Sequence, residues 1–143
     1  MAEGPIDLIR LEGEGNSLIL RITGKARLEG PATTDVLAGE ILVDTPFVRG
    51  SITTSVFPEE LRQWQQALDA LDAGQDIAWS EGTRGPEIFI ERDLGEERAH
   101  VTIRDNSMSL TTVTVTVPLV DAWFDDAYHR LDLTWQTWPP ADD

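Results

Sequence analysis

The sequence lacks cysteine altogether and contains only one lysine and two histidines among its 143 residues. Without cysteine there is no disulfide bond, thiolate metal site or cysteine nucleophile, although the redox compartment stays open. The first segment, MAEGPIDLIRL, has no basic region and no sustained apolar run, so neither a signal peptide nor a membrane span is expected. A cytoplasmic location is therefore the default prediction.

Positive charge is also scarce, because 26 Asp and Glu residues stand against 11 Lys and Arg, for a formal net charge of −15. Such a charge repels phosphate backbones and anionic lipid, so direct binding to nucleic acid or to a membrane is not expected. It favours a basic protein partner. Richness in Arg, Ala, Gly and Asp is also typical of a GC-rich genome or of salt adaptation, so the acidity is either functional or compositional.

The length and composition of the chain fit one globular domain. A chain of this length, with 41% hydrophobic and 26% charged residues, is large enough to bury one core without staples. We expect a single α+β domain over residues 1–138 and a short polar tail over 139–143.

Most segments alternate apolar and polar residues with period two, which is the pattern of a half-buried strand. Residues 48–56, 98–104 and 112–117 show it most clearly. Short turn signals such as DLGEE and DNS separate these runs and imply hairpins, hence an antiparallel arrangement. Residues 24–39 are the exception and are expected to form a long loop, a candidate contact region.

Two segments change to the helical period. In PEELRQWQQALDALDAG, starting at Pro58, an apolar stripe includes Leu61, Trp64 and Leu68, and Gly74 suits a left-handed cap. After Pro118 a second stripe follows, made of Val120, Trp123, Phe124, Ala127, Leu131, Trp135 and Trp138.

The predicted fold class is α+β: a twisted antiparallel sheet of about seven or eight strands with two α-helices packed on one face. The first helix is placed after the fourth or fifth strand and the second at the C-terminus. The other face of the sheet would then be polar, rich in hydroxyl groups and open either to solvent or to a partner.

No catalytic constellation is evident, and no catalytic residue, cofactor or metal ligand is predicted. His129 lies in an acidic stripe with Asp125 and Asp132, but a single nitrogen ligand favours a solvated face over a metal site. Glu87 and Glu91 share a strand face, yet their expected arginine neighbours would keep both ionised, whereas a general acid needs a raised pKa.

The candidate partner contacts are of two kinds. Trp135 and Trp138 lie near the C-terminus, where they either belong to the core or form a partly exposed patch. The remaining candidates lie on the polar sides of two predicted strands: Arg49, Ser51, Thr53, Thr112, Thr114 and Thr116.

Several segments carry a resemblance to known families: DLIRL at 7–11, PEELRQWQQALDALDAGQDIAW at 58–79 and RGPEIFIE at 84–91, followed by a charge-poor strand and an aromatic terminal helix. Over nearly the whole length the chain resembles an uncharacterised actinobacterial family of short acidic proteins with a domain of unknown function. In the order of its elements it is similar to the immunity proteins that accompany wall-associated polymorphic toxins. The resemblance implies a non-enzymatic, intracellular, partner-binding protein.

Three functions are therefore considered. The first is a non-enzymatic acidic interaction module that binds a basic protein, for example as an immunity-like inhibitor. The second is a structural or assembly role as a homo-oligomer formed through the exposed sheet face or the tryptophan patch. The third is an enzyme, which would need a pocket that gathers His100 or His129 with carboxylates.

Overall fold

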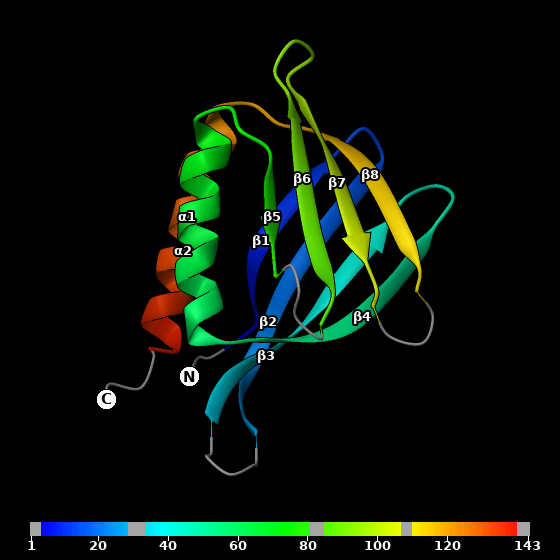
Figure 1. Cartoon of the computed structure of the whole chain (residues 1–143). Helices are drawn as coiled ribbons and strands as arrows, with labels where there is room; N and C mark the ends of the chain where they lie inside the picture. The colour runs from blue at the N-terminus through cyan, green and yellow to red at the C-terminus, as the bar shows by residue number, and fades with distance from the viewer. Residues whose placement is uncertain (1–3, 29–33, 81–84, 107–109, 140–143) are drawn as a thin grey trace.

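A computed structural model gives the structure of the chain and describes residues 4–28, 34–80, 85–106 and 110–139. In these ranges the chain forms eight strands and two helices, in which a run of four strands followed by one helix occurs twice (Figure 1). The elements are β1 (Ile6–Gly13), β2 (Asn16–Leu28), β3 (Thr34–Asp44), β4 (Arg49–Val56), α1 (Pro58–Asp72), β5 (Ile77–Trp79), β6 (Glu87–Asp93), β7 (Arg98–Arg104), β8 (Thr112–Pro118) and α2 (Ala122–Thr137).

The strands form two antiparallel sheets, in the orders β1-β2-β3-β4 and β5-β6-β7-β8. The predicted α+β class, the hairpin connections and the two helices are confirmed, but the prediction of one sheet of seven or eight strands is wrong. Alternation of apolar and polar residues indicates that one face of a strand is buried, but it does not indicate what covers that face. Two sheets that bury their apolar faces together therefore leave the same sequence pattern as one sheet covered by helices.

The long loop expected over residues 24–39 is also wrong. β2 continues to Leu28 and β3 begins at Thr34, while residues 29–33 lie outside the described ranges. A shift in the β2–β3 register falls between Ile22 and Gly24, and the consecutive residues Val36 and Leu37 are both buried. Such an irregularity breaks the alternation by which a strand is recognised in sequence.

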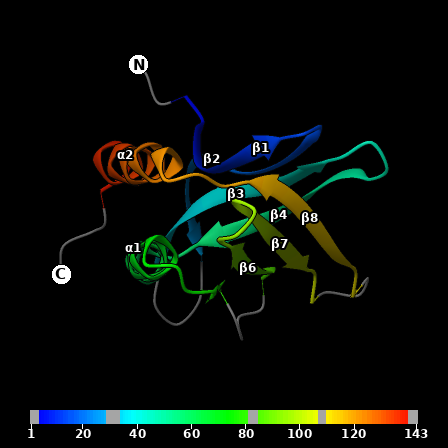
Figure 2. The same cartoon turned by 90° about the horizontal axis from the view of Figure 1, so that it is seen from above.

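One apolar core joins both sheets and both helices. Its fully buried members include Leu20 from β2, Trp64 from α1 and Ile90 from β6, and Leu131 from α2 is nearly so. The two helices lie side by side at one end of the molecule, and the sheets extend away from them (Figure 2). Neither helix has the length and apolar character that crossing a membrane would require, in the part of the chain that is described.

The ends of α1 follow from local sequence. At its start the Phe57 N–H donates to Glu60 Oε1 (2.9 Å), and Ser80 Oγ donates to Glu60 Oε2 (2.8 Å). At its end Gly74 has a φ of 94°, and the next residue, Gln75, donates its N–H to Ala70 O (3.0 Å). This Schellman arrangement confirms the predicted glycine cap, because a left-handed backbone is accessible to glycine without strain.

The two sheets together have four edges, and three of them lie against other elements. α2 runs along β1, α1 lies beside the three-residue β5, and β8 lies against the hairpin of β1 and β2. No other strand in the described ranges pairs with the outer edge of β4. β4 is therefore the open edge of the fold.

Candidate functional site

An apolar cleft opens between the two sheets, on the side away from the helices. Its walls are the inner faces of β3 and β4 on one side and of β7 and β8 on the other, and its volume is about 220 Å³. The register explains why these residues meet: Ile41 lies opposite Ile52 in the first sheet, and Ile103 lies opposite Val113 in the second.

The lining of the cleft is almost entirely aliphatic. Ile41, Val43 and Ile103 are buried, whereas Val48, Ile52 and Val113 are half-buried and therefore reach the opening. Gly50 leaves room in the wall, since a Cβ atom built on it would meet no atom within 4 Å. The space beside Gly50 is therefore open to a side chain of a bound molecule.

Polar groups are confined to the rim, which includes Ser51, Asp105 and Thr111. The backbone N–H of Asp105 donates to the carbonyl of Thr111 (2.8 Å) and closes the base of the β7–β8 connection. A mostly apolar concavity with a few polar groups at its rim is typical of a binding site. Such a cleft binds another molecule by burying apolar groups of that molecule.

Two exposed large apolar side chains are next in sequence to residues of the cleft, and no pattern in the sequence singles out either of them. Phe47, in the turn between β3 and β4, is 95% exposed and precedes Val48 of the wall. Leu110, which precedes Thr111 of the rim, is 71% exposed and has a φ of 54°. Both stand in turn segments of the sequence, where an apolar residue carries little signal, and only the structure shows that each is exposed next to a residue that lines the cleft.

The predicted partner contacts on the strands do not form one surface. Arg49 and Thr53 are exposed on β4, on the face opposite the cleft side of Ile52, whereas exposed Ser51 also belongs to the rim of the cleft. The other three lie on the outer face of the second sheet, where Thr114 bonds Thr102 (2.9 Å), Thr116 bonds His100 (2.8 Å) and Thr112 is exposed. The single hydroxyl-rich face expected from the sequence is thus divided between two sheets.

The two C-terminal tryptophans lie mainly against the protein. Trp138 is 6% exposed and belongs to the core, and half-buried Trp135 has the guanidinium of Arg62 6.0 Å from its ring centroid. Between them and β3 is a second apolar cavity of about 20 Å³. That volume holds about one water molecule, so it offers a partner little room.

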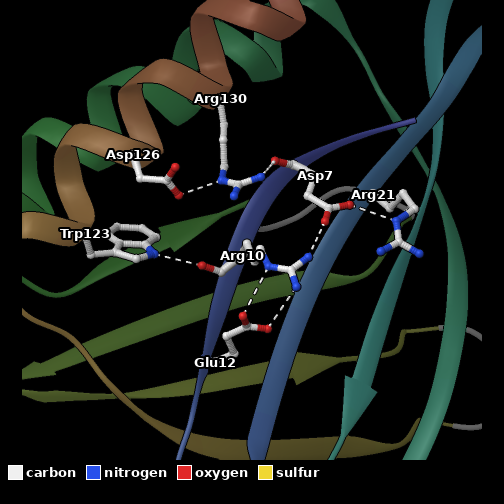
Figure 3. Close-up of polar contacts among 7 residues, drawn as sticks. All are labelled: Asp7, Arg10, Glu12, Arg21, Trp123, Asp126 and Arg130. Atoms are coloured by element: carbon white, nitrogen blue, oxygen red, sulfur yellow. Dashed lines mark hydrogen bonds and ion pairs between the residues drawn. The ribbon is translucent and has the colours of Figure 1, made fainter. Parts of the chain in front are cut away.

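A cluster of polar contacts joins α2 to β1 (Figure 3). The carboxylate of Asp7 accepts from Arg10 Nη1 (2.6 Å) and from Arg21 Nε (2.8 Å). Burial of Asp7 raises its pKa, but hydrogen bonds from Arg21 and Arg10, together with their charges, outweigh that effect and hold the pKa below its usual value. Each side chain drawn in Figure 3 already forms a hydrogen bond or ion pair with another part of the protein. We call this group of residues the clasp, because it holds α2 against β1.

The same clasp covers the free edge of β1. Trp123 Nε1 donates to Arg10 O (2.8 Å), and Arg130 Nη1 donates to Asp7 O (3.2 Å). Arg130 is held in turn by Asp126 (2.6 Å), one turn earlier on α2. Side chains of α2 therefore satisfy carbonyls that would otherwise be available to another strand.

The remaining titratable candidates are dispersed. His129 and Asp125 are exposed on α2, and the predicted pair of Glu87 with Arg104 is present at 3.6 Å. Within the described ranges, no three His, Asp or Glu side chains come together in a way that could hold a metal ion. Of the two apolar concavities described above, the cleft between the sheets is the larger.

Fold and cleft together define the class: an α+β domain of two facing sheets with an apolar cleft at the end remote from its helices. The chain belongs to a family of unknown function, DUF5959, whose model matches residues 6–139. The match spans every strand and both helices, so the expected membership in an uncharacterised family is confirmed. No curated protein matches the chain.

Proposed function

We propose that this protein is a non-catalytic binding module that holds a partner protein in the cleft between β3–β4 and β7–β8. The observation that carries the proposal is the cleft itself, with aliphatic walls and a wide opening. Burial of apolar surface is the main favourable term in protein association, and concave apolar sites are where partners anchor.

The size of the cleft favours a protein over a small ligand. Sites that enclose a small molecule usually have volumes of about 300–1,000 Å³, and about 220 Å³ is below that range. The space suits one or two side chains of a larger partner. Phe47 and Leu110, next in sequence to the cleft residues Val48 and Thr111, are exposed large apolar side chains of the kind that protein interfaces use.

The charge of the chain restricts the partner. A net charge of −15 disfavours nucleic acid and anionic membranes and accelerates encounter with a basic protein. An immunity-like role, in which the module occupies and inhibits a basic toxin, is one form of this function. The competing role is assembly of the chain with itself.

A substitution that fills the cleft tests the proposal without changing charge. Gly50→Leu places an apolar side chain in the open wall, and Thr112→Leu places the same side chain on the outer face of β8 as the matched control. Each variant is used as bait in native-cell extract with chemical cross-linking and quantitative mass spectrometry. We expect a basic protein that is captured by the wild type and the control, is lost with Gly50→Leu, and is captured less as salt is raised.

Two results would contradict the proposal. One is capture that is equal for all three baits, which would place any partner outside the cleft. The other is capture of proteins whose amount does not change with ionic strength, since salt screens the attraction between exposed opposite charges at separations beyond the Debye length, about 8 Å at physiological salt. Melting temperatures of the baits show that each is folded.

A further inference from the structure

The turn before β4 determines which backbone groups of β4 pair with β3 and which point away from it. Thr45 N–H donates to Val48 O (2.7 Å), which makes these two residues a hydrogen-bonded pair. Antiparallel strands alternate between hydrogen-bonded and non-hydrogen-bonded pairs, and the β3–β4 register runs to Leu37↔Val56 with no shift. The N–H and C=O groups that point away from β3 are therefore those of Arg49, Ser51, Thr53 and Ser55, the β4 edge.

The β4 edge has few of the features that normally protect an edge strand. Such strands are usually short, bulged, or marked by proline or lysine. β4 has eight residues, no proline or lysine, and regular pairing with β3, whereas the β1–β2 and β2–β3 pairings both contain a shift. The side chains of Ser51, Thr53 and Ser55 are exposed and small. A second strand can approach this edge closely.

The β4 edge and the cleft share one strand. Ile52 and Gly50 line the cleft from β4, while their neighbours Ser51 and Thr53 present the free backbone groups. An added strand would turn every second side chain toward the inner face, beside the cleft. Main-chain bonds along an edge, combined with pockets for alternate side chains, are the general mode of strand addition.

We infer that the β4 edge accepts an extended segment of the partner as a fifth strand of the first sheet, with alternate aliphatic side chains of that segment entering the cleft. This inference rests on the proposed function and specifies its mode. The volume of about 220 Å³ then receives one or two of the inward side chains, and the outward ones lie over the small hydroxyl residues.

The segment is neutral or basic on its outward side. Glu40 and Asp44 of β3 lie across from Thr53 and Arg49 on the outer face, and Asp44 already holds Arg49 at 3.2 Å. A second copy of this chain would bring a further −15 of charge to the same edge, and like charge opposes self-association. A cationic partner strand is thus favoured over a homodimer.

The test uses a phage-displayed library of random twelve-residue segments selected on the full, immobilised chain. The selected segments are then made as peptides and titrated against the wild type and variants. Thr53→Pro removes an outward N–H but no bond to β3, and proline is compatible with an edge strand at such a position. Thr53→Val is the matched control, because it changes the side chain and keeps the N–H.

We expect the selected segments to alternate apolar residues with period two and to be rich in Arg or Lys. Their affinity should fall about tenfold with Thr53→Pro, because one main-chain hydrogen bond is lost and the carbonyl that accepted it is left unpaired, and should change little with Thr53→Val. Gly50→Leu should also weaken them. Ser51→Pro, which removes a different outward N–H, repeats the test if Thr53→Pro melts early.

The outcomes separate the inference from the function beneath it. Segments that lose affinity with Gly50→Leu but not with either proline variant would overturn strand addition and leave the cleft as the binding site. A library that yields no segment dependent on the cleft would overturn both. Light scattering that shows a dimer broken by Thr53→Pro would assign the edge to a second copy, and the inference would then be wrong.

Discussion

Trp64 and Trp123 have different surroundings although both belong to helical apolar stripes. Trp64 is fully buried and its ring centroid lies 5.2 Å from that of Trp79. Trp123 is half-buried and donates its N–H to Arg10 O on β1 (2.8 Å). The first residue fills the core, whereas the second also ties α2 to the sheet.

Replacing these rings by alanine should destabilise the protein unequally. Trp64→Ala should lower the free energy of unfolding by about 3–5 kcal/mol, because the fully buried ring leaves a cavity. Trp123→Ala should cost less, roughly 2–3 kcal/mol, since part of its surface is already in water. Asp125→Asn, at an exposed position on α2, is the control and should be nearly neutral. Urea titration followed by circular dichroism measures all three; an unchanged midpoint for Trp64→Ala would contradict the assignment of the core.

Asp7 should make stability depend on pH in acid. The pKa of its carboxyl is below the usual value in the folded protein, so its ionised form contributes stability above about pH 4 and that contribution is lost as the pH falls through the folded pKa. Asp7→Asn should therefore destabilise the protein by about 1–3 kcal/mol at neutral pH. The difference from wild type should shrink below about pH 4. Chemical unfolding across this pH range is the measurement, with Glu12→Gln, a more exposed partner of Arg10, as the control.

For single residues, the sequence predicts which side chains are buried better than it predicts which hydrogen bonds they form. The stripe of Leu61, Trp64 and Leu68 is buried as expected, because helical spacing fixes which side chains share a face. The bond between Arg130 and the carbonyl of Asp7 joins positions 123 residues apart. No local pattern encodes such a contact, so the clasp could not be derived from the sequence.

Among the elements, β8 packs against the β1–β2 hairpin at a glycine that leaves no room for a Cβ atom. A Cβ atom on Gly13 would lie 2.7 Å from the ring of Pro118, and Gly13 has a φ of 151°. Gly13→Ala should therefore push β8 from the hairpin and cost about 1–3 kcal/mol. Gly24→Ala, in β2 with no atom within 4 Å, is the matched control and should cost far less. Thermal unfolding compares the two, and equal melting temperatures would show that the hairpin and β8 are not in tight contact.

Element boundaries were predictable where alternation or capping is regular. β4, β7 and β8 alternate without interruption, and α1 begins at Pro58 and ends just before the predicted Gly74 cap. The second half of β2 and the start of β3 were missed, because a register shift at Ile22 disturbs the period. The cleft was missed for another reason: Ile41, Ile52 and Ile103 have the spacing of ordinary core residues. Only the arrangement of the two sheets shows that these residues line a cleft.

For the whole molecule, the repeated order of four strands and a helix explains both the shared core and the unequal edges. Each half contributes one sheet and one helix, and the two helices lie together at one end. Helices at one end leave the other end without a covering layer. Side chains of α2 cover the edge of β1 at the helical end, whereas no helix of the described ranges covers the edge of β4 at the other end. The proposed binding edge is therefore a consequence of the topology.

Net charge also acts on the molecule as a whole. An excess of 15 negative charges repels itself in the folded state, and salt weakens that repulsion over distances beyond about 10 Å at 0.1 M. Salt also weakens surface ion pairs such as Arg62 with Glu59, but each exposed pair contributes only about 0–1 kcal/mol. Repulsion should therefore dominate the response to salt.

Raising sodium chloride from about 0.02 M to 0.5 M should accordingly raise the melting temperature by roughly 3–6 °C, the shift that about 1 kcal/mol produces in a domain of this size. Scanning calorimetry is the measurement. A variant with exposed acids of the helical layer replaced by amides, Asp72→Asn together with Asp132→Asn, should melt higher at low salt and respond less to added salt. A melting temperature that falls with salt would mean that local ion pairs outweigh the net charge. Attraction of a basic partner would then depend on the few acids around the β4 edge rather than on the charge of the whole surface.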